Sequence, residues 1–381
     1  MQIYSQDRGA VGDYFKDRYT IISNDYMYFA SVFAKGKNLH ASVPTFNKFS
    51  KEYGTDPFTY LNGKDYFPKE NYFVYNNYTP VGDRMYFSEE NAIKIDGMRI
   101  DIEEFYKEEY INSNEYYFLL ASLLECVLKV SNTTGTYQAF LKFWESRALK
   151  QFELLPLEMN LALSTSKNND FYNTDTNKLA REISGDIAYI DPPYTTTQYT
   201  VSYHLLETIA KYDNPDIFGI TGRRKNREMS NYSYKDRAFH EFEDLLRQLD
   251  FEHVLISYSN QSILSLDEMI NLASRFAVNN EVHVESSEYR EYATNNSSHK
   301  GKNNKLKECI IYFKKDRTIE KSPLNFSGSK DKIANKIFKH LPKHVNVFVD
   351  AMGGAFNVGA NVVALDKVIY NEKNPFVFNI I

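Results

Sequence analysis

The chain has 381 residues, of which 43% are hydrophobic and 25% charged, as is typical of a folded globular protein with one large or two ordinary domains. Its net charge of −5 and pI of about 6.0 exclude unspecific coating of nucleic acid by a basic protein, but they permit a local basic surface. Cys126 and Cys309 are too few for a disulfide framework, so we expect core thiols in a cytoplasmic protein. We expect neither a signal peptide nor a membrane span.

A glycine pair and an acid near the N-terminus have the spacing of a cofactor site. Gly9 and Gly12 lead into an amphipathic run through Phe15, and the β-branched residues 19–25 predict a strand that ends in Asp25. In dinucleotide-binding α/β folds such an acid bonds ribose hydroxyls, so Gly9, Gly12 and Asp25 are candidates for binding S-adenosylmethionine. A helix start followed by a turn explains the same pattern, and both interpretations stay open.

The region from about residue 38 to residue 169 is harder to interpret. Residues 116–127 have the apolar pattern and length of a buried helix. Residues 140–144, followed by Arg147 and Lys150, mix aromatic and basic side chains. This mixture fits a phosphate contact, but we favour an amphipathic helix with a solvated basic face.

Asp175 stands just before a short helical pattern at residues 177–181. A carboxylate at this place can accept the adenine amine of a cofactor. Aspartate is also among the best residues for capping a helix N-terminus, and the two roles are compatible.

The most informative segment is a short strand that ends in an acid and two prolines. Residues 187–190 are apolar, β-branched or aromatic, which predicts a buried strand. The sequence Asp191-Pro192-Pro193-Tyr194 follows directly. Prolines cannot donate to a sheet ladder, so the acid should lie at the carboxyl end of the strand, where α/β sheets bind ligands. A surface turn is the alternative, because Asp-Pro-Pro is common turn chemistry.

These four residues suit the methylation of a nucleobase amine. The exocyclic nitrogen is a poor nucleophile because its lone pair is delocalised into the ring. The carboxylate of Asp191 and the carbonyl of Pro192 can each accept one of its N–H bonds and free the lone pair. Tyr194 offers a flat surface on which an extruded base can stack, and such stacking contributes about 1–3 kcal/mol per base. Pro193 keeps the turn stiff.

A helix and a basic cluster follow. Residues 203–210 predict a helix in which His204 is packed rather than catalytic, because this methyl transfer needs no imidazole. The next polar segment predicts a DNA contact, since clustered cations with polar neighbours suit phosphates and base edges, although a solvated loop is the alternative. Its basic residues are Arg223, Arg224, Lys225 and Arg227.

Two further strands precede a charged segment. Residues 254–260 predict an apolar strand beside the one that ends at Asp191, and residues 308–313 predict a last strand. Residues 314–321 are charged and predict a linker.

After the linker the pattern of a cofactor site restarts. A phosphate-loop-like opening with Lys330 precedes a predicted helix at residues 331–341. A strand at 345–350, a glycine loop at 351–359 and a strand at 367–372 follow, and no second Asp-Pro-Pro-Tyr occurs. This order of elements is a stronger cofactor signal than the glycines near the N-terminus. The candidate cofactor residues here are Lys330, Asp350, Gly353, Gly354 and Glu372.

Taken together, these motifs resemble the D12 class of adenine-specific DNA methyltransferases, most closely its FokI-type members with two such domains in tandem. The matching segments are Asn24-Asp25, residues 84–87, 131–137, 147–149, 191–194 and 203–210 for a first domain, and residues 323–330 and 348–359 for a second.

The resemblance implies an α/β fold: a seven-stranded, Rossmann-like class I methyltransferase sheet with an inserted helical and loop region for DNA recognition. It implies S-adenosylmethionine as cofactor, no metal, and site-specific adenine-N6 methylation of duplex DNA in a restriction–modification system. A cognate endonuclease would act in the same system without a stable complex. The expected domains are residues 1–315, a linker at 316–321, and the cofactor half of a second domain at 322–381.

The sequence departs from the family pattern at both ends. Asp7 stands where the family has its first glycine, and its carboxylate would repel that of the cofactor. The second cofactor half has no tetrad of its own. Three interpretations follow: an active methyltransferase, with or without the C-terminal segment supplying the cofactor half as in a permuted protein; an inactive fragment of a tandem enzyme; or a DNA-binding remnant that contacts DNA through residues 223–227.

Overall fold

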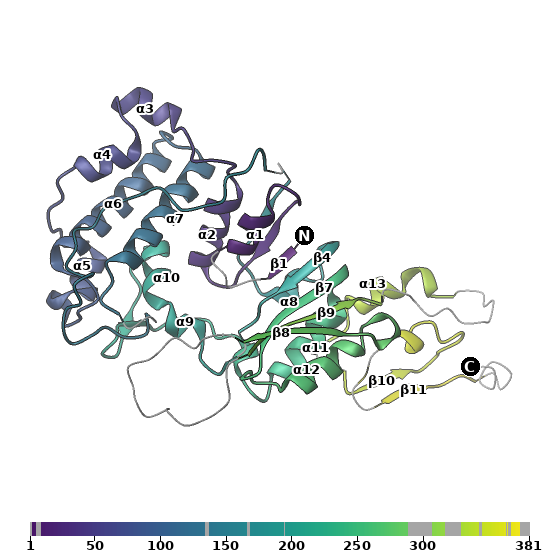
Figure 1. The fold of residues 1–381 in the computed structure, drawn as a ribbon. Coiled ribbons are helices and arrows are strands. Elements are labelled where there is room, and N and C mark those ends of the chain that lie inside the picture. Colours follow the sequence, from purple (N-terminus) through teal and green to yellow (C-terminus); the bar gives the residue numbers. More distant parts are fainter. Residues whose placement is uncertain are drawn as a thin grey trace. The chain divides into compact units, whose positions relative to one another are not determined.

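The computed structural model divides the chain into two compact units (Figure 1). The first unit comprises Met1–Asp175 and Tyr189–Ser230, and the second comprises Thr176–Ala188 and Asn231–Ile381. The structure describes residues 2–4, 9–133, 137–165, 168–193, 195–288, 307–316, 329–342, 345–362, 364 and 367–373. Among the helices of these residues, none combines the length and the apolar character that a membrane span requires.

The first unit is mainly helical, with three short strands and a small hairpin. Its elements are β1 (Gln2–Tyr4), α1 (Ala10–Phe15), β2 (Ile22–Asn24), α2 (Tyr28–Asn38), α3 (Asn47–Tyr53), α4 (Pro57–Gly63), α5 (Phe73–Tyr78), η1 (Pro80–Gly82), α6 (Glu89–Lys107), α7 (Ser113–Lys129), β3 (Asp170–Tyr172), α9 (Tyr199–Ser202), α10 (His204–Lys211), β5 (Ile217–Phe218) and β6 (Arg223–Arg224).

The second unit holds the longer strands. Its elements are α8 (Thr176–Leu179), η2 (Asn231–Ser233), α11 (Ala238–Gln248), β7 (Asp250–Ser259), α12 (Leu266–Ser274), η3 (Val278–Asn280), β8 (His283–Glu288), β9 (Lys307–Lys314), η5 (Asp331–Ile333), α13 (Ala334–Phe338), β10 (Val347–Asp350), η6 (Gly359–Asn361) and β11 (Lys367–Tyr370). Strand β4 (Ser184–Ile190) contributes residues to both units.

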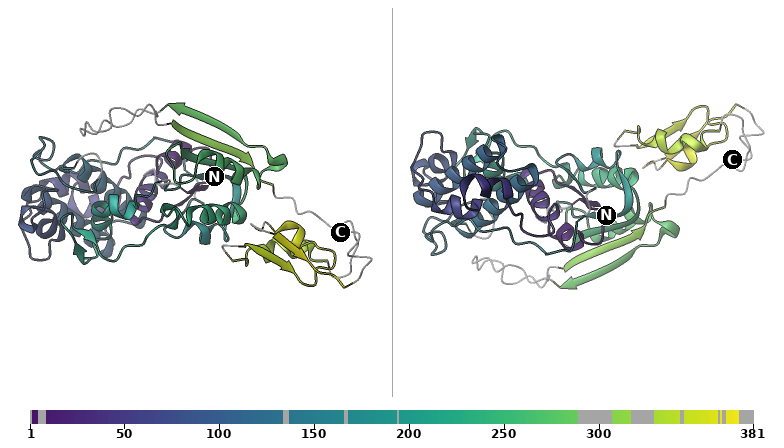
Figure 2. Two further views of the ribbon diagram at one scale, coloured as in Figure 1. Left: turned by 90° about the horizontal axis from the view of Figure 1, so that it is seen from below. Right: turned by 90° about the horizontal axis from the view of Figure 1, so that it is seen from above.

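Among the described residues, seven strands form one sheet in the order β3-β2-β1-β4-β7-β9-β8. Strands β1, β2 and β3 pair in parallel, whereas β9 pairs antiparallel with both β7 and β8. Figure 2 shows β8 and β9 side by side as a long pair. The mixed sheet confirms the predicted α/β fold class.

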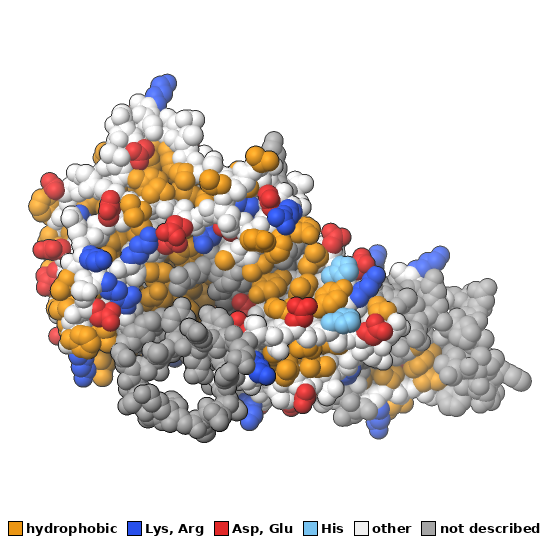
Figure 3. Space-filling model, in the orientation of Figure 1, with side chains coloured by type: hydrophobic (Ala, Val, Ile, Leu, Met, Phe, Trp, Pro, Cys, Tyr) orange, Lys and Arg blue, Asp and Glu red, His pale blue; other side chains and the backbone are white. Residues whose placement is uncertain are grey.

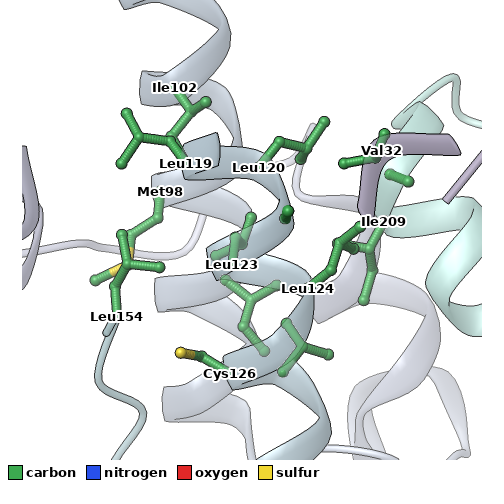
Figure 4. Close-up of a cluster of buried hydrophobic side chains, with 14 of the residues drawn as sticks. Val32, Met98, Ile102, Leu119, Leu120, Leu123, Leu124, Cys126, Leu154 and Ile209 are labelled. Carbon is green, nitrogen blue, oxygen red and sulfur yellow. The ribbon is translucent and has the colours of Figure 1, made fainter. Parts of the chain in front are cut away.

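The hydrophobic core of the first unit is built around α7. Leu119, Leu120, Leu123 and Leu124 are all fully buried, and they lie among Val32 of α2, Met98 and Ile102 of α6, and Ile209 of α10 (Figure 4). The helix begins with a capping box between Asn112 and Glu115, which satisfies amides at its N-terminus. The prediction of a buried helix over residues 116–127 is therefore confirmed.

Most of the other predicted elements are also found, several with shifted ends. The strand before Asp191 is β4, the strand predicted at 254–260 is β7, and the strand predicted at 308–313 is β9. Strand β7 neighbours β4, as expected. The helix predicted at 331–341 is shorter, because it consists of one 3-10 turn and the five residues of α13. The linker lies mostly outside the described residues, so the predicted domain boundary stays a prediction.

The amphipathic helix predicted around residues 140–150 is wrong. This segment contains turns and an isolated β-bridge between Thr133 and Phe140. The amide of the Asn132 side chain donates to the carbonyls of Leu141 and Phe143, and its oxygen accepts from the amide of Glu145. A side chain that takes these backbone groups competes with helix formation.

Candidate active site

The acid and two prolines directly follow β4, as predicted. Ala188 and Ile190 of this strand are buried, and so are Pro192 and Pro193. Asp191 is half-buried. A carboxylate in a stiff and partly shielded position can accept hydrogen bonds from an amine with little rearrangement. Tyr194 lies outside the described residues, so its stacking role stays a prediction.

The structure brings Asp25 and Asp175 to neighbouring strand ends in the first unit. The side chain of Asn24 donates to the carbonyl of Thr174 at 3.1 Å and accepts from the amide of Thr174 at 3.2 Å. Asn173 donates to the carbonyl of Asp25 at 2.8 Å. Because β2 and β3 are parallel, these bonds hold the two acids at the carboxyl ends of adjacent strands.

Tyr26 follows Asp25 in the chain and interacts with Asp175 and with Glu228, which comes just after the basic cluster. Its pKa is raised, first by burial, then by a hydrogen bond to Glu228 and by the negative charges of Glu228 and Asp175. Tyr26 therefore stays a neutral hydroxyl. The set of Asp25, Tyr26, Asp175 and Glu228 combines acceptors and a donor, as recognition of a polar cofactor requires.

Glu207 is a supporting residue that the sequence did not reveal. Its carboxylate accepts from the amides of Tyr28 at 3.2 Å and Phe29 at 3.0 Å, so it caps the N-terminus of α2. Oδ1 of Asp25 accepts from the amide of Met27 at 2.7 Å just before this helix. The signal in the sequence is indirect: Met27 occupies the N-cap position without a capping side chain, and exposed amides there need an acceptor from elsewhere.

The glycines near the N-terminus have a packing role. Gly9 has φ of 77°, and a Cβ atom on it would lie 2.8 Å from the Cα atom of Ala34 in α2. A Cβ atom on Gly12 would lie 2.7 Å from the side-chain oxygen of Asn38. Close approach of α1 to α2 thus requires both glycines, and a cofactor contact for them stays a prediction. Asp7 lies outside the described residues.

The second unit brings four of the C-terminal candidates together between β10 and β11. Oε2 of Glu372 accepts from the amide of Gly354 at 3.0 Å, and Oδ2 of Asp350 accepts from the amide of Gly359 at 3.2 Å. Gly354 has φ of 49°, and a Cβ atom on Gly353 would lie 2.3 Å from the ring of Tyr370. The result is a tight glycine loop between two parallel strands, with one carboxylate at each strand end.

The opening segment of this part also reaches the loop. Ser329 accepts a hydrogen bond from the side chain of Asn357 at 2.9 Å. The neighbouring Lys330 is exposed. The structure thus places Lys330 next to a residue that contacts the glycine loop, and its own cofactor contact stays a prediction.

His204 is packed, as predicted. It is fully buried in α10, with its ring against those of Tyr78 and Tyr86 at centroid distances of 6.1 and 5.9 Å. Burial, reinforced by nearby arginines of which Arg223 has the largest effect, lowers the pKa of this histidine to about 3. It is therefore neutral and does not act as an acid–base group at physiological pH.

The basic cluster is less uniform than its sequence implies. Arg224 is 7% exposed and forms two hydrogen bonds to the carboxylate of Asp213, at 2.8 and 2.5 Å. Arg223 and Arg227 are half-buried, whereas Lys225 is exposed. Arg224 therefore has a structural role in holding the hairpin. The DNA contact stays a prediction for all four residues, and Lys225 has the most accessible charge among them.

No group of three or more His, Cys, Asp or Glu side chains that could hold a metal ion occurs among the described residues. Both Cys126 and Cys309 are buried free thiols, which confirms the prediction that they belong to the core.

Comparison with known proteins agrees with the resemblance. The family model of the D12 class N6 adenine-specific DNA methyltransferases matches residues 9–272. Modification methylase LlaI of Lactococcus lactis subsp. lactis is 65% identical over 370 residues, which cover 97% of this chain and 60% of the relative. Type II methyltransferase M.FokI of Planomicrobium okeanokoites is 37% identical over 396 residues, 98% of this chain and 60% of the relative.

A shorter relative is matched over most of its own length. Type II methyltransferase M.NlaIII of Neisseria lactamica is 36% identical over 295 residues, which cover 77% of this chain and 84% of the relative. The chain thus spans about 60% of the length of the first two relatives and most of the third. No solved structure matches the chain. The family model matches residues 9–272, which is most of the chain, and the Asp-Pro-Pro sequence directly follows β4. The chain therefore belongs to the D12 class of N6 adenine-specific DNA methyltransferases.

Proposed function

We propose that this chain carries out site-specific N6-methylation of adenine in duplex DNA, with S-adenosylmethionine as the methyl donor. The observation that carries the proposal is the position of Asp191, which directly follows β4 and is held by two buried prolines. The family membership and the names of the relatives, which are modification methylases, support the same reaction.

In this proposal Asp191 and the carbonyl of Pro192 accept the two N–H bonds of the adenine amine. Their pull localises the lone pair on nitrogen, and Tyr194 stacks on the extruded base. When bound, the cofactor supplies a methyl group that is already electrophilic, so no metal is needed. The nitrogen gains the methyl group and loses one proton, for which the carboxylate of Asp191 is the nearest acceptor.

Two sets of residues have the chemistry to hold the cofactor, one in each unit. In the first unit, Asp25 suits ribose hydroxyls and Asp175 suits the adenine amine. In the second unit, the tight loop of Gly353 and Gly354 lies beside the carboxylate of Glu372, which suits ribose hydroxyls. Carboxylates at strand ends next to a glycine loop are the usual partners of such cofactors.

The setting we propose is a restriction–modification system, in which methylation protects DNA from an endonuclease of the same specificity. This role places the protein in the cytoplasm with the DNA that it modifies. A stable complex with the endonuclease is not required, because the two enzymes share only the DNA site.

The test is a methylation assay of the purified chain on unmethylated duplex DNA with labelled S-adenosylmethionine, together with calorimetry of cofactor binding. We expect N6-methyladenine from the wild type and a loss of at least about 100-fold in rate for Asp191→Ala, as for other groups acting in the transition state. Asp186→Ala removes an exposed acid of the same strand and should keep full activity.

The absence of both binding heat and a thermal shift with S-adenosylmethionine would overturn the proposal. Cofactor binding without methylation, combined with DNA binding that has a steep salt dependence and no sequence preference, would indicate a binding protein instead of an enzyme.

A further inference from the structure

The β5–β6 hairpin presents an isoleucine to solvent at its tip. Ile217 pairs with Arg224, and Phe218 pairs with Arg223. The turn begins and ends at glycines with positive φ, 71° at Gly219 and 64° at Gly222. Ile220 lies between them and is 82% exposed. Single exposed apolar residues are ordinary, so the exposure of Ile220 alone does not indicate a function. The contacts that fix the turn are the additional evidence.

Every carbonyl of the turn is bound by a side chain from one distant segment. Arg84 donates to the carbonyls of Gly219 and Ile220, each at 3.1 Å. The hydroxyl of Tyr86 donates to Thr221 at 3.0 Å, and that of Tyr78 donates to Gly222 at 2.9 Å. Both tyrosines are fully buried. The turn is therefore fixed through its backbone alone, and the side chain of Ile220 takes no part in holding it.

The close fit continues at Gly222. A Cβ atom there would lie 2.7 Å from Nε of Arg84 and 2.9 Å from the ring of Tyr78. The β5–β6 hairpin is thus held against buried aromatic side chains of residues 78–86. A turn that is fixed in this way keeps Ile220 in place when this side chain contacts a binding partner.

Cations and a second apolar side chain flank the tip. Phe218 is 40% exposed, with the guanidinium of Arg227 5.1 Å from its ring centroid. Lys225 is exposed beside them. Two acids of the segment are paired, Asp213 with Arg224 and Glu228 with Tyr26, whereas Asp216 is exposed and lies 4.0 Å from Lys225. Apolar side chains next to cations match a base stack bordered by phosphates.

The segment that follows the hairpin is bonded to the segment that follows Asp191. Gln198 donates to the carbonyl of Ser230 at 2.9 Å, and the amide of Ser230 donates to Gln198 at 2.8 Å. These two hydrogen bonds join the two ends of the segment 198–230, which contains α9, α10 and the hairpin. Gln198 follows shortly after Asp191, and all of these residues belong to the first unit.

We propose that Ile220 is an apolar wedge that enters the base stack of the DNA when the target adenine is extruded. The inference rests on the proposed function, because chemistry on an adenine amine requires the base to leave the duplex. Apolar side chains such as isoleucine commonly unstack base steps in this way. Phe218 supports the wedge on the hairpin, and Lys225 holds the adjacent phosphate.

The test compares Ile220→Ala with wild type on two duplexes that contain the methylation site of this chain, mapped beforehand by sequencing N6-methyladenine. One duplex is fully paired, and the other has a mismatch opposite the target adenine. We expect kcat/KM of the variant to fall about tenfold or more on the paired duplex and to recover within about threefold of wild type on the mismatched one, because weakened pairing lowers the unstacking cost.

The matched control is Leu163→Ala, which removes a fully exposed leucine of the same unit and should behave as wild type on both duplexes. Equal losses of Ile220→Ala on both duplexes, or no loss on either, would overturn the wedge. If wild type does not methylate, fluorescence of 2-aminopurine in bound duplex reports unstacking, and an equal signal from Ile220→Ala overturns the wedge. A wild type that neither methylates nor binds duplex refutes the proposed function and the wedge together.

Discussion

Asp96 is a fully buried carboxylate in α6 whose protonation links pH to stability. It accepts hydrogen bonds from the amides of Val74 and Tyr75 and, at 2.5 Å, from the hydroxyl of Tyr212. Burial is the largest influence and raises the pKa of Asp96 to about 6 in spite of these bonds. Because the folded state binds the proton more tightly than the unfolded state, protonation of Asp96 stabilises the fold.

Asp96 therefore makes the fold more stable at low pH than at neutral pH. The stabilisation is fully present below the unfolded pKa of 3.8 and is lost as pH rises through the folded pKa of about 6. We expect the difference in unfolding free energy between wild type and Asp96→Asn to fall by on the order of 2 kcal/mol between roughly pH 4.5 and 7.5. Urea unfolding across this range measures it.

The control for this measurement is Glu104→Gln, an exposed acid of the same helix. Its difference from wild type should be small and independent of pH. Parallel stability profiles for wild type and Asp96→Asn would show that Asp96 does not titrate in this range.

At the scale of elements, α7 is the helix on which the first unit depends. Leu120 is fully buried in it. Truncating a buried leucine removes transfer free energy and leaves a cavity, so Leu120→Ala should lower the unfolding free energy by about 2–5 kcal/mol. The exposed Leu163 provides the control, because Leu163→Ala should change it by less than about 0.5 kcal/mol. Similar losses in both variants by chemical denaturation would contradict the assignment of this core.

Elements with a strong periodic pattern could be predicted from the sequence. The helix around Leu120 and the strand before Asp191 both have continuous apolar faces. The spacing of apolar residues along the chain is enough to predict such elements. The segment at residues 140–150 could not be predicted, because its conformation depends on the side chain of Asn132, which precedes it in the loop. Local pattern does not contain such a competitor for backbone bonds.

In the candidate site, too, some residues can be predicted from the local sequence and others cannot. Asp25, Asp175 and the acid after β4 are visible because strand ends and prolines mark them. Glu207 could not be found from its own neighbourhood, since the amides that it caps belong to α2, far away in the sequence. Nor does a run of basic residues reveal that Arg224 is buried against Asp213. Residues that act through distant partners need the fold before their role is apparent.

At the scale of the whole molecule, charge limits how DNA can be bound. The net charge is −5, and among the described residues on the face in Figure 3 acidic and basic side chains are interspersed. Each phosphate contact releases condensed counterions and adds about 0.9 to the salt slope of binding. A protein of this charge should therefore rely on few phosphate contacts and show a shallow slope.

Lys225 is the residue on which this expectation can be measured. Its side chain is 56% exposed and its ammonium lies 4.0 Å from the carboxylate of Asp216, and an exposed pair at this distance holds the charge only weakly. Lys225→Ala should weaken duplex binding uniformly across sequences and lower the salt slope by about 1. Fluorescence anisotropy over roughly 50–200 mM salt measures both quantities. Lys107→Ala, which removes an exposed lysine at the end of α6, should leave the slope unchanged. A loss confined to one DNA sequence, with the slope preserved, would instead assign Lys225 to a base edge, since phosphate contacts carry no sequence information.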